Sequence, residues 1–173
     1  MSVAGPESFQ IATILIGMEW ATPPVNKVYE ALGAIGDGRM EVTGNTARVY
    51  SSSRNKFYEV SYDPESNTIS SNDNASYYVG YLGYPAIAFL LICGLVDWDP
   101  VMAEYLAGFR WKDINQRFKN DFAKTDAYID EELVKVHGID LTQFHQKLEK
   151  LLADVMHLKL MKPASLPRPP KGY

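Results

Sequence analysis

The chain has 173 residues, enough for one domain that buries about 70% of the surface of its unfolded chain. Its net charge of −4 argues against a dedicated nucleic-acid binder, which would carry a basic stripe. Residues 1–109 carry a net −7 and residues 110–173 a net +3, so we expect two parts that attract each other or faces of opposite sign. A single cysteine excludes an intramolecular disulfide and predicts a reducing, cytoplasmic location.

Residues 8–20 are rich in apolar side chains, and this density fits a buried helix and a buried strand almost equally. We favour a helix. Thr22-Pro23-Pro24 then reads as a cap followed by prolines in the first turn of a second helix, which three glycines between residues 33 and 38 end. No signal peptide is expected, because no basic region precedes the first apolar residues.

From residue 39 to residue 71 the apolar period changes from about four residues to two. Four short segments alternate apolar and polar residues, and the turn-forming residues between them predict an antiparallel meander of four strands. The clearest strand runs from Phe57 to Tyr62, and the turn after it begins at Asp63-Pro64. One face of this sheet is expected to stay polar.

The longest apolar stretch without a charge covers residues 77–96. Its last eleven residues, 86–96, fall well short of the roughly 20 needed to cross a bilayer, so they predict a buried central helix and no membrane span. Pro85 suits the first turn of this helix. Cys93 lies inside the stretch, and we expect it to be an inert core thiol.

Helical patterns fill the remainder of the chain up to residue 161. Asp99-Pro100 predicts a short helix that ends near Gly108. Apolar residues then step by three or four from residue 111 to residue 136, which predicts one long helix closed by Gly138. Asp140 predicts the N-cap of the last helix, and the short linker predicts an antiparallel helical hairpin.

These patterns together predict one α+β domain in residues 1–162. It has N-terminal helices, a four-strand antiparallel meander, a buried central helix and a C-terminal antiparallel helical hairpin. Residues 163–173 hold four of the ten prolines and are expected to form a proline-rich tail.

Several motifs that could carry chemistry fail on order or spacing. Asp63, Glu65 and Asn67 match the first ligands of a calcium loop, yet a threonine stands where that loop needs glycine. The three histidines are not spaced for zinc, and the glycine cluster closes a helix where a phosphate loop would open one. Asp126 and Asp130 share a helix face, but the Glu-x-x-His partner of a di-metal bundle is absent. We therefore predict no metal and no cofactor.

The most polar material lies in two segments that end predicted strands, residues 51–56 and 70–74. If those strands are neighbours, hydroxyl, amide and charged groups gather on one rim beside the tyrosines of residues 77–84, where they could bind an anion, sugar or nucleotide. Turns and a helix cap explain the same residues without a ligand. The residues that we expect to contact a ligand are Ser53, Arg54, Lys56, Asp73, Tyr77 and Tyr81.

Two functions from different classes follow. The first is a non-enzymatic binding or protein-interaction module, a homo-oligomer or a protein with another protein partner. Phe57 and Tyr58 alternate in one strand, so one ring faces away from the core, and the outer sheet face and the tail would form the contact. The second is a small enzyme or small-molecule binder that uses the rim. No serine stands in a nucleophile-elbow pattern, so no reaction is assigned.

Overall fold

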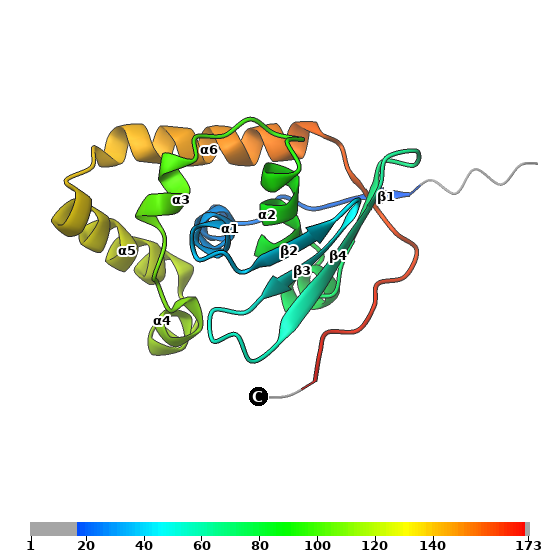
Figure 1. The fold of residues 1–173 in the computed structure, drawn as a ribbon, viewed down its shortest axis with the longest axis horizontal. Coiled ribbons are helices and arrows are strands. Elements are labelled where there is room, and N and C mark those ends of the chain that lie inside the picture. The colour runs from blue at the N-terminus through cyan, green and yellow to red at the C-terminus, as the bar shows by residue number, and fades with distance from the viewer. Residues whose placement is uncertain (1–16, 172–173) are drawn as a thin grey trace, which may run out of the picture.

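A six-stranded sheet with α2 packed on one face organises the chain, and the fold is of the predicted α+β class (Figure 1). The computed structural model describes residues 17–171. The strands are β1 (Met18–Glu19), β2 (Met40–Thr43), β3 (Thr46–Tyr50), β4 (Phe57–Asp63), β5 (Thr68–Ser71) and β6 (Met161–Lys162). The helices are α1 (Asn26–Gly36), the π-helix η1 (Ala75–Val79), α2 (Tyr84–Ile92), α3 (Val101–Tyr105), α4 (Trp111–Arg117), α5 (Phe122–His137) and α6 (Leu141–His157).

The predicted four-strand meander is confirmed, and two short strands extend it. β2 to β5 pair in antiparallel succession, and the full strand order is β1-β6-β5-β4-β3-β2. Side chains alternate across this register, so one face is apolar and the other polar. The buried inner face carries Ala47, Val49, Tyr58, Val60 and Ile69. The outer face carries Glu41, Thr43, Thr46, Arg48, Glu59 and Ser61.

The predicted central helix is confirmed as α2, in which every residue from Pro85 to Leu91 is buried. It packs on β4 and β5 on one side and on α1 on another. The prediction that Cys93 is a core thiol is wrong, because Cys93 is exposed. α2 ends at Ile92, and the next residues turn to the surface although the apolar sequence continues.

The first predicted helix, residues 8–20, falls mostly outside the described residues. Where it is described, the prediction is wrong, because Met18–Glu19 pair with Lys162 and Met161 as strand β1. The apolar density fitted both structures equally, and the strand depends on a partner far away in the sequence. The second predicted helix is α1, which starts after the two prolines and runs on through Gly33. A Cβ atom at Gly33 would lie 2.4 Å from Nε1 of Trp111, so close packing explains this glycine.

The single long helix predicted over residues 111–136 is wrong, because the chain forms α4 and α5 there. Lys119 and Asn120 have positive φ angles of 54° and 61°, which no α-helix contains. Asp121 then caps α5 by accepting a hydrogen bond from the backbone of Lys124. The apolar spacing stays in phase across the break, so periodicity alone did not reveal it.

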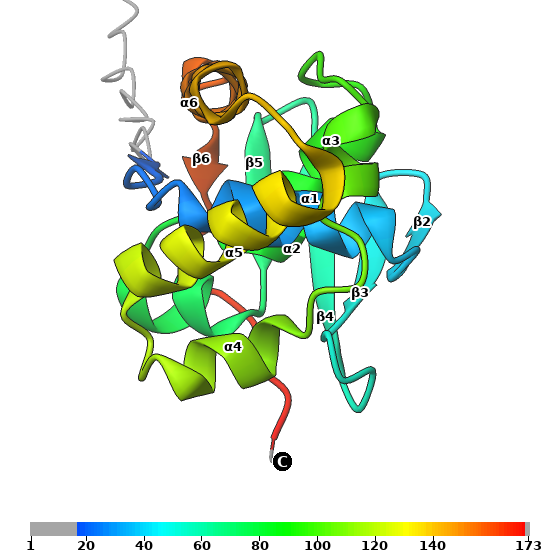
Figure 2. The same cartoon turned by 90° about the vertical axis from the view of Figure 1, so that its left-hand side faces the viewer.

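The C-terminal end agrees with the predicted caps. Gly138, at φ 63°, ends α5, and the carboxylate of Asp140 accepts from the backbone N–H groups of Thr142 and Gln143 at the start of α6. α6 follows α5 after a short linker, as predicted, but the two helices cross steeply and do not lie antiparallel, because Figure 2 shows α6 end-on and α5 across the view. α1 packs against both helices (Figures 1 and 2). Among the described residues, no helix combines the length and apolarity needed to span a bilayer.

The described part of the tail, residues 163–171, forms no helix or strand. Leu166 is half-buried against the core cluster. Pro167 lines a shallow hollow on the outer face of the sheet together with Arg48, Glu59 and Ser61. The tail therefore lies on the sheet of its own chain.

Candidate functional site

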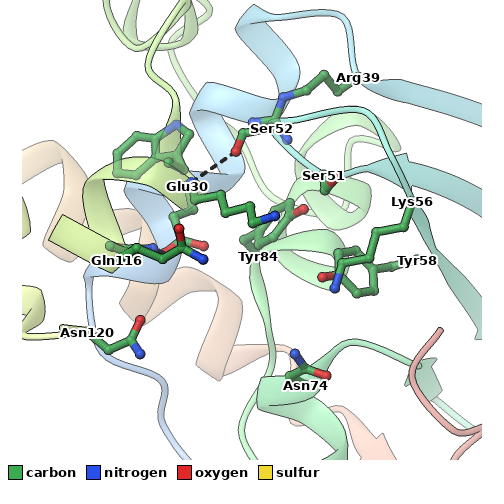
Figure 3. A pocket seen from close by; sticks show the side chains of 13 residues that line it. Glu30, Arg39, Ser51, Ser52, Lys56, Tyr58, Asn74, Tyr84, Gln116 and Asn120 are labelled. Carbon is green, nitrogen blue, oxygen red and sulfur yellow. Dashed lines mark hydrogen bonds between the residues drawn. The ribbon is translucent and has the colours of Figure 1, made fainter. Parts of the chain in front are cut away.

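A cavity of about 300 Å³ opens among α1, α4, the start of α2 and the loop between β3 and β4. Figure 3 shows Arg39 and Ser52 at one end, Asn74 and Asn120 at the other, and Tyr84 between them. The cavity is lined by Glu30, Arg39, Ser51, Ser52, Lys56, Tyr58, Asn74, Tyr84, Trp111, Lys112, Asn115, Gln116 and Asn120. Its wall is polar for most of its extent.

Arg39 holds a positive charge at this wall although it is only 2% exposed. Its Nε donates to a carboxylate oxygen of Asp37 at 2.9 Å, and its Nη1 donates to the carbonyl oxygen of Tyr50 at 2.7 Å. A buried charge is costly unless it is paired, and these bonds offset the cost. Nη2 makes no hydrogen bond to the described residues, so it can donate to a molecule in the cavity.

Glu30 is the one carboxylate among the described lining residues, and it is 5% exposed. Its Oε1 accepts from Nζ of Lys27 and from Nδ2 of Asn115, each at 3.0 Å. Burial disfavours the charged form of Lys27, but the neighbouring Glu30 carboxylate outweighs it and raises the pKa of Lys27. The other carboxylate oxygen, Oε2, has no hydrogen bond from the described residues.

Charged side chains line the cavity. Three are cationic, Arg39, Lys56 and Lys112, and one is a carboxylate, Glu30. Glu30 is paired with Lys27, and Arg39 is paired with Asp37. Guanidinium and ammonium groups are donors that can bind an anion.

Hydrogen bonds fix the walls of the cavity relative to one another. The backbone N–H of Lys112 donates to Oγ of Ser52 at 3.0 Å, which ties α4 to the β3–β4 loop. The hydroxyl of Thr125, a buried residue of α5, donates to Oδ1 of Asn115 at 3.1 Å. Burial raises the pKa of Tyr84 well above its ordinary value, so its hydroxyl is a neutral donor and acceptor.

The structure separates the six residues that the sequence grouped into a rim. Lys56 lines the cavity. Ser53 and Arg54 belong to the same loop but point elsewhere: Oγ of Ser53 donates to Asn55, and Nη2 of Arg54 donates to the backbone carbonyl oxygen of Asp37. Neither lines the cavity.

The other three predicted residues also lie off the cavity wall. Asp73 is buried, and its carboxylate accepts from the hydroxyls of Ser71 and Ser76 at 2.6 Å and from the backbone N–H of Ser76 at 3.0 Å. These bonds hold the turn before α2. Tyr77 stacks edge-on against Tyr78, and Tyr81 forms a β-bridge with Ala21.

The lining residues that sequence reasoning missed lie on helices, where polar residues resemble an ordinary solvated face. Glu30 lies on α1 and Lys112, Asn115 and Gln116 lie on α4. One signal was available: Asn26, Lys27 and Glu30 place three polar residues in the first turns of a helix that is otherwise largely apolar. All three are buried.

The family model of Uncharacterised conserved protein UCP014422 matches residues 20–161. The chain belongs to this family. The cavity lies wholly within the part of this family member that the model matches, whereas the tail lies outside it. No curated protein and no solved structure matches the chain. Within residues 17–171, no three acidic, histidine or cysteine side chains gather as they would around a metal ion.

Proposed function

We propose that this chain is a binding protein for a small anionic molecule, which it holds in the cavity between α1, α4 and the β3–β4 loop. The observation that carries the proposal is the guanidinium of the buried Arg39, which lines the cavity and whose Nη2 makes no hydrogen bond to the described residues. Guanidinium groups bind carboxylate and phosphate oxygens through charge-assisted hydrogen bonds, which are stronger than neutral ones.

The size and shielding of the cavity support the same proposal. Its volume of about 300 Å³ lies at the lower end of the range of cavities that hold small ligands, about 300–1,000 Å³. Arg39 is held by Asp37 and by the carbonyl of Tyr50 before any ligand arrives, so little side-chain entropy remains to be lost on binding.

Inorganic phosphate is the simplest probe of this proposal. A ligand that binds only the folded chain stabilises it by about 2.7 kcal/mol when the free ligand concentration is one hundred times the Kd. We expect phosphate to raise the melting temperature of the natural chain and of Lys135→Met, which removes a lysine far from the cavity on α5. The shift should be much smaller in Lys56→Met and Lys112→Met, which each remove one lining cation. Equal shifts in all four proteins would contradict the proposal.

The interaction module predicted from the sequence is a second proposal, with one supporting observation. Tyr50 and Phe57 form a ring pair, with centroids 5.8 Å apart, at one end of the outer sheet face, and both are only half-buried. A second copy or another protein would contact this pair and the tail. Truncation after Met161 tests this. A loss of oligomer mass with unchanged melting supports the proposal, whereas unchanged mass with a lower melting temperature makes the tail part of the fold.

A further inference from the structure

We propose that the outer face of the sheet binds an extended, proline-rich segment of a partner protein that carries basic side chains, and that the chain's own tail, residues 163–171, occupies this face as an intramolecular competitor. The inference rests on the interaction module, which is the second proposal above, and names the kind of partner. It does not depend on the anion site.

The burial of the tail repeats every three residues. Pro163, Leu166 and Pro169 are half-buried, whereas the two residues that follow Pro163 and the two that follow Leu166 are exposed. Pro170 is half-buried as well. A polyproline II helix has three residues per turn, so residues at this spacing share one side of it. The tail, which is the red trace in Figure 1, therefore has the burial pattern of a bound proline-rich segment.

The outer face of the sheet offers the groups that recognise such a segment. Tyr50 and Phe57 lie opposite each other on this face as a half-buried ring pair, with centroids 5.8 Å apart. Next to them, Glu41 and Glu59 flank Arg48 in the register of β2, β3 and β4. Proline-rich peptides bind in grooves lined by aromatic rings, and carboxylates pair with arginine or lysine side chains of the peptide.

The charges of the face and of the tail are complementary. The hollow on the outer face is lined by two carboxylates, Glu41 and Glu59, and by one guanidinium, that of Arg48. Residues 163–171 carry Arg168 and Lys171 and no acidic side chain. The carboxylate of Glu59 makes no hydrogen bond or ion pair with the described residues, so it is available to a cation of the partner. The face therefore favours a basic segment over an acidic one.

The contacts that hold the tail allow its displacement. Pro167 lines the hollow and Leu166 packs against the core cluster, yet residues 163–171 make no hydrogen bond or ion pair with the described residues. The strands of the outer face lie within the part of the chain that the family model matches, and the tail follows that part. While the tail covers the face, a partner can bind only the fraction of chains whose tail has left it.

Fluorescence anisotropy on the full chain tests the inference with a labelled peptide of the sequence of residues 163–171. Leu166→Asp releases the tail, because it places a charge at a half-buried apolar position. We expect this variant to bind the peptide at least ten times more tightly than the natural chain does. A peptide with glycine in place of every proline should bind the variant at least five times more weakly, because it loses the preformed extended structure.

Further full-chain variants keep the test decisive if Leu166→Asp fails to fold. Pro169→Gly together with Pro170→Gly loosens the tail without adding a charge, and this variant should also bind the peptide more tightly than the natural chain. Glu59→Lys, added to either releasing variant, should weaken the peptide at least fivefold. Glu131→Lys, at an exposed carboxylate on α5, is the matched control that should leave the affinity unchanged.

The outcomes separate this inference from the interaction module. Peptide binding that is no tighter in the releasing variants than in the natural chain overturns the inference. Equal binding of the glycine peptide, or an unchanged affinity after Glu59→Lys, also overturns it, because the face then recognises neither proline nor charge. If truncation after Met161 still lowers the oligomer mass in these cases, the interaction module stands without this inference. If the mass stays the same, both fail.

Discussion

Asp126 provides a quantitative test of the packing between α5 and α1. Burial, together with the nearby carboxylates of Asp130 and Glu30, raises the pKa of its carboxyl to about 6, although Asn26 and Lys27 act in the opposite direction. Nδ2 of Asn26 donates to Oδ1 of Asp126 at 2.6 Å. Oδ1 of Asn26 is buried and has no partner among the described residues. A protonated Asp126 can donate to an amide oxygen, whereas the carboxylate cannot.

The sign of the pH effect follows from the direction of this shift. The carboxyl of Asp126 binds its proton more tightly in the folded chain than in the unfolded chain, where its pKa is about 3.8. The contribution of Asp126 to the free energy of unfolding therefore falls as the pH rises from about 4 to about 6. A difference of about two pH units corresponds to about 3 kcal/mol. The carboxyl is partly open to solvent, so we expect about half of this, 1–2 kcal/mol.

Asp126→Asn removes the titration and keeps an oxygen that can accept from Asn26. We expect the variant to be about 1–2 kcal/mol more stable than the natural chain at pH 7.5 and nearly equal to it at pH 4. Urea unfolding at four pH values, followed by tryptophan fluorescence, measures the difference. Asp97→Asn, at an exposed carboxylate, is the control. A constant difference across the pH range, or a less stable variant at pH 7.5, would refute the reasoning.

Three further predictions test the fold and its corrections. Gly36→Ala should destabilise the chain by about 1–3 kcal/mol in urea unfolding, because the new Cβ would lie 2.1 Å from the carbonyl oxygen of Ala103. This loss is expected although alanine favours helices more than glycine does. A gain in stability would show that α3 can move away from the new methyl group at little cost. Cys93 should react with a thiol reagent in the folded chain, and reaction only in denaturant would contradict its exposed position. Thr125→Val should cost about 1–3 kcal/mol because it leaves Oδ1 of Asn115 without its donor, and an unchanged midpoint of unfolding would show that water replaces the bond.

The sequence predicted correctly those helices and strands that are determined by residues close to one another in the chain. The meander follows from alternating residues and turn chemistry, and the start of α6 follows from Asp140, whose cap the structure contains. The break between α4 and α5 was missed because it depends on two residues with positive φ, Lys119 and Asn120, neither of which is glycine. β1 was missed because it exists only through pairing with the distant β6.

The cavity was predictable only in part, because half of its wall depends on contacts between residues that are far apart in the sequence. Its sheet-end half comes from short polar segments. Four residues that fall within the ranges of the predicted rim and its tyrosines, Ser51, Ser52, Asn74 and Tyr84, line the cavity together with Lys56. Its other half comes from α1 and α4, which meet the loop only through tertiary packing. The spacing of residues within one helix does not show which distant loop that helix will pack against.

The most direct test of the central claim is a nuclear magnetic resonance titration of the full chain, uniformly labelled with ¹⁵N, with inorganic phosphate. We predict saturable shifts with a single Kd, concentrated in the backbone signals of residues 51–56 and of Arg39 and Lys112. Shifts that are absent, or that spread over exposed lysines without saturating, would contradict an anion site in this cavity.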